Sequence, residues 1–148
     1  MATGKIEIRG MSPLLSVFDM RRSVHFYCDI LGFEMVDHSP FYAEGEFHWA
    51  MLRFGNVELM LNTAYDEGER PDQPDPARVA SHGEVVFYLG CPDVDAAYRH
   101  LIANQVKVKP PKRVRYGGVS PFDVLSVFDP DGYHLCLQWP AAETSPAG

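Results

Sequence analysis

The sequence is poor in the features that would assign it to several large protein classes. Of its 148 residues only three are cysteines, at positions 28, 91 and 136, and no two of them form a CxxC pair. This spacing argues against a disulfide framework and against a thiolate zinc site, and it favours a reducing compartment. No apolar run reaches membrane-spanning length, and the N-terminus lacks the apolar segment of a signal peptide. We therefore expect a cytoplasmic protein with no membrane partner.

Basic residues are also scarce and scattered. The formal net charge is -7, and the densest basic stretch is Lys109–Arg115, which we interpret as a solvated loop. Because nucleic-acid binding needs a basic face to neutralise phosphates, we expect no nucleic-acid partner. Hydrophobic residues make up 46% of the chain and charged residues 22%, a balance that supports a packed globular core.

The first part of the chain has the pattern of a strand, a helix and three further strands. Residues 12–18 are predicted to form the first strand, and Asp19 is a suitable N-cap for a helix that stops at Gly32. Residues 33–38 look extended. Residues 48–62 form a predicted hairpin that turns at Gly55-Asn56.

The second part repeats this order. A strand is predicted over 84–90, followed by a helix that Asp93 caps and that Asn104 ends in the left-handed conformation. The segment 106–109, VKVK, looks extended, and 121–140 is a hairpin closed by the turn DPDG at 129–132. An internal duplication of a β-α-β-β-β unit accounts for both halves.

The predicted fold class is therefore α+β, with two β-α-β-β-β units in a single domain over 1–148. The units are expected at 12–63 and 84–139, joined by a linker over 64–83 and followed by a disordered tail over 140–148. Because side chains alternate across a strand, the leucines of each last strand should face a helix, and Phe47 and Trp139 are assigned to the core. The opposite, half-apolar sheet faces should enclose a ligand cavity.

Four segments, at 12–34, 55–61, 91–102 and 128–138, resemble the vicinal oxygen chelate superfamily. That group includes glyoxalase I, extradiol dioxygenases and the bleomycin-resistance proteins. The resemblance implies paired β-α-β-β-β units, usually in a homodimer, with one divalent metal per cavity in the enzymes. It places the metal ligands at Ser12, Glu58, Val86 and Cys136. Valine has no donor atom and serine is a weak ligand, so we expect no metal and no cofactor. A displaced site using His82, Glu84, Glu58 and His134, with His48 nearby, remains an alternative.

Several side chains are candidates for binding a small molecule on the cavity face. They are His48, Glu58, Met60, Asn62, Tyr88, Tyr116, His134, Cys136 and Gln138. Glu58 is the best catalytic candidate, as a general base, or it hydrogen-bonds Asn62, Gln138 or a water. Cys136 is either a nucleophile activated by His134 or a small buried apolar residue.

These observations predict a metal-free protein that sequesters an aromatic or cationic small molecule in a dimer cavity. The alternative is a lyase, isomerase or dioxygenase-like enzyme, either metal-independent or with the displaced metal site. A metal-independent enzyme would use Glu58 as base and Tyr88 or His134 as acid. A non-catalytic accessory domain is a third possibility. The sequence leaves open whether the units pair within one chain or between two chains.

Overall fold

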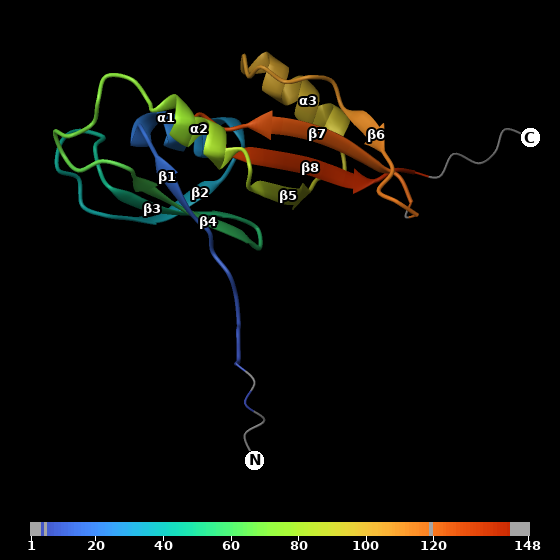
Figure 1. The fold of residues 1–148 in the computed structure, drawn as a ribbon, viewed down its shortest axis with the longest axis horizontal. Helices are drawn as coiled ribbons and strands as arrows, with labels where there is room; N and C mark the ends of the chain where they lie inside the picture. The colour runs from blue at the N-terminus through green and yellow to red at the C-terminus, as the bar shows by residue number, and fades with distance from the viewer. Residues whose placement is uncertain (1–3, 5, 119, 143–148) are drawn as a thin grey trace, which may run out of the picture. The chain divides into compact units, whose positions relative to one another are not determined.

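The computed structural model describes residues 4, 6–118 and 120–142, and it divides into two compact units. Unit 1 runs to Arg70 and unit 2 begins at Pro71, a boundary that falls within the segment predicted to be a linker. Each unit is built on one four-stranded sheet (Figure 1). Among the described residues, no helix is both long enough and apolar enough to cross a membrane.

Unit 1 has the predicted order of elements. They are β1 (Leu14–Val17), α1 (Met20–Val24), η1 (His25–Ile30), β2 (Glu34–His38), β3 (Trp49–Phe54) and β4 (Val57–Thr63). The sheet order is β1-β4-β3-β2, with β1 parallel to β4 and the other neighbours antiparallel. The buried face of this sheet carries the side chains of Leu15, Val17, Ala50, Leu52, Leu59 and Leu61.

The helix of unit 1 begins and ends where the sequence predicts. The Asp19 carboxylate accepts the Arg21 backbone N–H at 3.1 Å, and Gly32 ends the helix with φ +95°. Within it, η1 continues α1 as a wider π-helix, in which the Leu31 N–H donates to the Phe26 carbonyl at 3.0 Å. The predicted hairpin is also confirmed, because the strands meet at Gly55-Asn56.

Unit 2 repeats this topology and adds one helix. Its elements are α2 (Pro76–His82), β5 (Val86–Gly90), α3 (Val94–Ala103), β6 (Lys112–Val114), β7 (Phe122–Phe128) and β8 (His134–Pro140). The sheet order is β5-β8-β7-β6, with β5 parallel to β8 and α3 packed against β7 and β8. The α+β fold class is therefore confirmed, with one β-α-β-β-β arrangement in each unit.

Several local predictions in unit 2 are wrong. Asn104 has φ −96°, and the left-handed residue is Gln105, with φ 62°. The segment 106–109 forms no strand, and β6 lies instead within the basic stretch interpreted as a loop. Pro110 and Pro111 explain this shift, since proline lacks the N–H that a sheet ladder needs, so pairing begins only after them.

The assignment of Trp139 to the core is also wrong, because its side chain is 44% exposed, whereas Phe47 is buried as predicted. Trp139 pairs with Asp123 near the end of β8, where its ring lies beside Gly90. Of the predicted tail, Pro140 belongs to β8 and the Ala141 N–H donates to the Pro121 carbonyl at 2.9 Å. Residues 143–148 lie outside the described residues.

Helix α2 packs on the predicted DPDG turn. Asp75 caps α2 through the Ala77 N–H at 3.0 Å, and Pro76 occupies the first turn, a start signal that the linker interpretation overlooked. In the turn, the Asp129 carboxylate accepts the N–H groups of Asp131 and Tyr133 at 2.8 and 2.9 Å. Gly132 has φ +86° and faces α2, so that a Cβ placed on it would lie 2.5 Å from a helix carbonyl oxygen. The turn is confirmed, and α2 covers it.

Candidate functional site

The second sheet brings together five of the predicted ligand-binding residues on its open face, opposite α3. In the parallel pair, Tyr88 on β5 lies beside Cys136 on β8, and the same alternation places His134 and Gln138 on this face. Tyr116 lies in the loop that follows β6, and its hydroxyl donates to the Gln138 amide oxygen at 3.4 Å. The sequence predicted that these residues share one face, and the pairing of β5 with β8 places Tyr88, His134, Cys136 and Gln138 there.

The open face of the second sheet carries aromatic side chains. On β5, β7 and β8 it carries no Asp, Glu, Lys or Arg side chain. Tyr88 is 57% exposed and Phe128 is 55% exposed, although both are large apolar rings. Phe128 stacks on His134 with ring centroids 4.7 Å apart, and Tyr116 lies 5.9 Å from Phe122. Exposed aromatic faces of this kind bind flat apolar groups by burial and stacking. The arrangement therefore suits an aromatic ligand.

Four polar side chains on this face form two hydrogen-bonded pairs, Tyr116 with Gln138 and Ser126 with His134. Burial, followed by the charges of Cys136 and Tyr88, raises the pKa of Tyr116, which keeps its hydroxyl protonated and able to donate. His134 Nε2 is hydrogen-bonded to the Ser126 hydroxyl on the neighbouring strand. Cys136 is buried, and burial raises the pKa of its thiol, so the unreactive thiol form is favoured. This environment supports the buried apolar role for Cys136 over the nucleophilic one.

The open face of the first sheet carries the predicted residues Glu58, Met60 and Asn62 at alternate positions of β4. Met60 is paired with Leu14 on β1 and with Met51 on β3, which makes the middle of this face apolar. Asn62 lies opposite Trp49. Apolar and thioether side chains therefore surround a single amide at the end of the strand.

Glu58 is an ion-paired residue. The Arg53 guanidinium, directly opposite on β3, donates to one Glu58 carboxylate oxygen through Nε at 3.1 Å and through Nη2 at 2.7 Å. Both side chains are partly exposed, so the pair adds little stability in water. Both hydrogen bonds go to Oε2, so the ion pair engages one of the two carboxylate oxygens.

The residues at the superfamily's metal-ligand positions do not fit a divalent cation. Glu58 is held by Arg53, Val86 has no donor atom, and Cys136 is a buried thiol. The Ser12 hydroxyl donates to the Met51 sulfur at 3.9 Å. Across the described ranges, 4, 6–118 and 120–142, no group of three or more His, Cys, Asp and Glu side chains is arranged to hold a metal ion. No step through a metal is derived from these residues.

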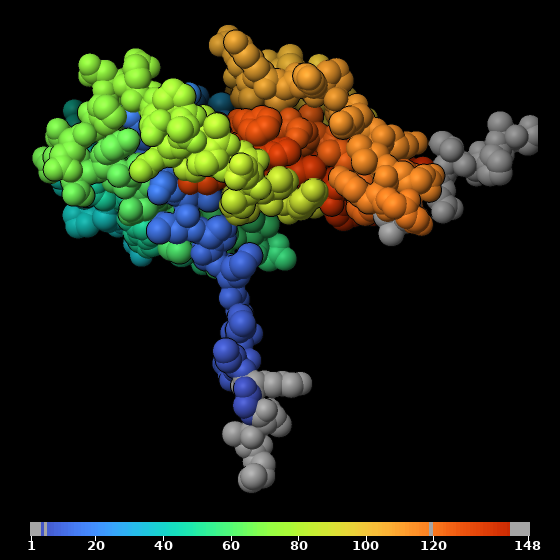
Figure 2. All heavy atoms as spheres, in the orientation of Figure 1, coloured from blue at the N-terminus to red at the C-terminus, as the bar shows by residue number. Residues whose placement is uncertain are grey.

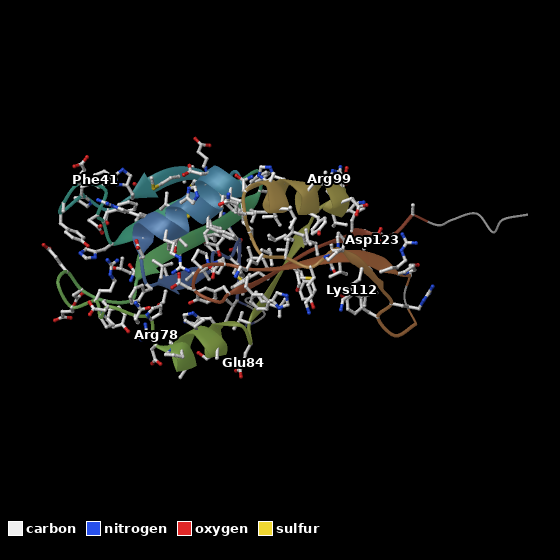
Figure 3. All side chains as sticks on the ribbon, turned by 90° about the horizontal axis from the view of Figure 1, so that it is seen from above. Phe41, Arg78, Glu84, Arg99, Lys112 and Asp123 are labelled. Atoms are coloured by element: carbon white, nitrogen blue, oxygen red, sulfur yellow. The ribbon has the colours of Figure 1, made fainter. Side chains whose placement is uncertain are left out.

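Two residues of the alternative, displaced metal site, His82 and Glu84, lie outside the strands. His82 is the last residue of α2, where Nδ1 donates to the Asp131 carbonyl at 2.8 Å and the ring stacks on Tyr133 at 4.1 Å. Glu84 follows the C-terminal end of that helix, before β5 begins (Figure 3). The alternation of a strand, on which their placement at the cavity rim depended, therefore does not extend to them.

His48 also lies apart from the open face of the first sheet. It immediately precedes β3, and its Nδ1 is 3.0 Å from the Thr63 hydroxyl. Its ring stacks on Tyr42, with centroids 4.5 Å apart. Thr63 and Tyr42 both line a pocket of about 250 Å³ at the end of the first sheet. Sequence reasoning missed this pocket because part of its wall, from Tyr65 to Arg70, belongs to the segment interpreted as a linker.

The family model and the curated relatives that match this chain belong to the same group of proteins. A family model described as the Glyoxalase/Bleomycin resistance protein/Dioxygenase superfamily matches residues 11–137. Bleomycin resistance proteins of Geobacillus stearothermophilus and Staphylococcus aureus are 32% identical over 94 residues, which cover 60% of this chain. The matched stretch covers 66% of each relative, just under two thirds of its length.

Solved structures share the fold at lower identity. A bleomycin-binding protein in complex with bleomycin is 18% identical with a TM-score of 0.62, covering 90% of this chain and 100% of that one. TnmS3, an antibiotic binding protein from Streptomyces sp. CB03234, is 20% identical with a TM-score of 0.60, covering 93% of this chain and 100% of that one. At these identities the likeness extends to the fold alone.

Proposed function

This chain belongs to the glyoxalase/bleomycin resistance protein/dioxygenase superfamily, and on that premise we propose that it is a cytoplasmic small-molecule-binding protein. It sequesters an aromatic or cationic molecule without a metal. The observation that carries the proposal is the open face of the second sheet, where the exposed rings of Tyr88 and Phe128 lie beside polar side chains that form hydrogen bonds. An aromatic ligand laid on this face would bury Tyr88 and Phe128 and would meet the polar groups of Gln138 and His134.

The relatives support a binding role. Two of the solved structures bind antibiotics by their own descriptions, and the curated relatives are bleomycin resistance proteins. The net charge of -7 would favour approach of a cationic ligand over an anionic one. The catalytic candidate Glu58 is ion-paired with Arg53.

A titration tests the proposed function directly. The protein, treated with a chelator, is titrated with bleomycin and with a panel of aromatic and cationic small molecules while tryptophan and tyrosine fluorescence is followed. We expect saturable quenching by at least one compound, with an affinity that added zinc, nickel, manganese or iron leaves unchanged. A flat response across the panel, or binding that requires added metal, would contradict the proposal.

We further propose that the binding protein is a homodimer, and the N-terminal segment supports this. Residues 6–11 extend away from the rest of unit 1 (Figures 1 and 2), and Ile6, Ile8 and Met11 are 80% to 87% exposed. Ile6 and Ile8 alternate with Glu7 and Arg9, the pattern of a strand with one apolar side. Such a segment would be stabilised by pairing with a sheet edge of a second copy.

Light scattering after size exclusion tests the dimer. The unchanged chain is expected to elute at twice 16.6 kDa, and the double variant Ile6→Asp/Ile8→Asp at 16.6 kDa. Ile102→Asp, on an exposed position of α3, is the matched control and should remain dimeric. A monomeric parent would refute the dimer, and a double variant that stays dimeric would refute the role of the N-terminal segment.

A further inference from the structure

The pocket beside His48, Thr63 and Tyr42 is separate from the open sheet faces and lies within unit 1, where the parallel strands β1 and β4 both end. Its volume is about 250 Å³. Its walls come from the start of α1, the loop between β2 and β3, and the loop that follows β4. The residues that matter for its chemistry are Phe18, Tyr42, Glu46, Tyr65, Asp66 and Arg70. Three aromatic rings, two carboxylates and one guanidinium therefore surround a small space.

The chain's own guanidinium shows how a cation is held there. The Arg70 Cζ lies 5.4 Å from the centroid of the Phe18 ring, within the range of a cation–π contact. Its Nη1 is 3.5 Å from the Phe18 carbonyl oxygen and 3.8 Å from the Asp19 carboxylate. Tyr65 packs edge-on against Phe18, with ring centroids 6.1 Å apart. Arg70 is nevertheless partly exposed, and its contacts are long, so another cation can compete with it.

The charges around the pocket are mainly negative. Glu46 is paired with Arg21 at 3.3 Å, whereas in the described part of the chain the Asp66 carboxylate has no hydrogen-bond or ion-pair partner. Burial, then the charges of Glu46 and Glu67, raises the pKa of Tyr42, while Arg70 lowers it. Among the described residues, the carboxylates Glu46 and Asp66 line the pocket together with the single guanidinium of Arg70. The imbalance favours a positively charged ligand.

We propose that this pocket binds an organic cation, namely a protonated amine. The ammonium group takes the position over Phe18 that the Arg70 guanidinium holds, with Tyr65 beside it and Asp66 as the counterion. The pocket is smaller than the roughly 300–1,000 Å³ typical of drug-sized ligands, so it accommodates one cationic group with a short apolar body. This site uses none of the residues assigned to the open faces, and it stands independently of the proposed function.

The test uses three probes of one shape and different charge: benzylamine, benzyl alcohol and benzoate. They are titrated into ¹⁵N-labelled protein at neutral pH, and the backbone amides of Thr63 and Gly68, which line the pocket, report binding. We expect saturable shifts with protonated benzylamine only. Arg70→Ala removes the internal competitor and should tighten this binding about threefold or more, given the strength of one exposed cation–π contact.

Asp66→Asn should weaken benzylamine binding by about threefold, in proportion to one exposed ion pair. Arg78→Ala, an exposed arginine on α2 (Figure 3), is the matched control for Arg70 and should leave the titration unchanged. Preferential binding of benzoate that is lost in Arg70→Ala would overturn the proposal, because Arg70 would then bind an anion in this pocket. Equal shifts with all three probes, or none at Thr63 and Gly68, would also overturn it.

Discussion

Replacing Tyr88 by leucine is expected to weaken binding of the compound that quenches fluorescence most strongly by about tenfold or more. Tyr88 is 57% exposed on the open face of the second sheet, so its ring is available to a ligand and contributes little to the core. Burial of one aromatic ring on binding contributes roughly 1–3 kcal/mol, which corresponds to a factor of about five to one hundred and fifty in the dissociation constant. Isothermal titration calorimetry measures the change directly.

Trp139→Leu is the matched control for this variant. Trp139 is a similarly exposed aromatic residue of the same sheet, but strand alternation places it on the opposite face from Cys136 and Gln138. Its replacement should change the dissociation constant by less than about twofold, since strand alternation places its Cβ on the face opposite Gln138. Equal losses in both variants would indicate general damage to the sheet, and no loss in Tyr88→Leu would remove the open face from the site.

Replacing Gly132 by alanine is expected to lower the free energy of unfolding by about 2–5 kcal/mol. Two costs combine, since Gly132 has φ +86° and its new Cβ would lie 2.5 Å from the Val79 carbonyl oxygen. A left-handed alanine costs about 1–2 kcal/mol, and forcing α2 away from the turn adds about 1–3 kcal/mol. Urea unfolding followed by circular dichroism gives the value.

Gly55→Ala separates these two costs. Gly55 also lies in a hairpin turn with positive φ, +58°, but no atom lies within 4 Å of the position its Cβ would take. Only the conformational cost of about 1 kcal/mol is therefore expected for it. If the two alanine variants are equally stable, the contact between α2 and the DPDG turn is absent in solution.

Hydrophobic alternation and turn residues were enough to predict the order of strands and helices along the chain. The Gly55-Asn56 pair located the first hairpin, and the capping aspartates located both main helices. The same turn also fixes the register that pairs Arg53 with Glu58, so the ion pair that engages this candidate base was itself predictable.

The remaining errors arise from features that alternation does not describe. Trp139 has the parity of the buried leucines, but it lies near the strand end, where the core no longer covers it. His82 has the parity of the open face, but it belongs to a helix. The pocket beside Phe18 and Arg70 depends on a loop that folds back onto a strand end, and no periodic pattern reports such a contact.

The order of the strands has a consequence for how each unit folds. In both sheets the last strand along the chain lies in the interior, β4 between β1 and β3 and β8 between β5 and β7. The first strand of a unit therefore has no backbone partner until the last one has been synthesised and has inserted beside it. Such non-local pairing slows folding and leaves unpaired strand edges exposed in the meantime. Ribosome-bound chains that stop before Val57 or before His134 should accordingly be the ones that need chaperone protection.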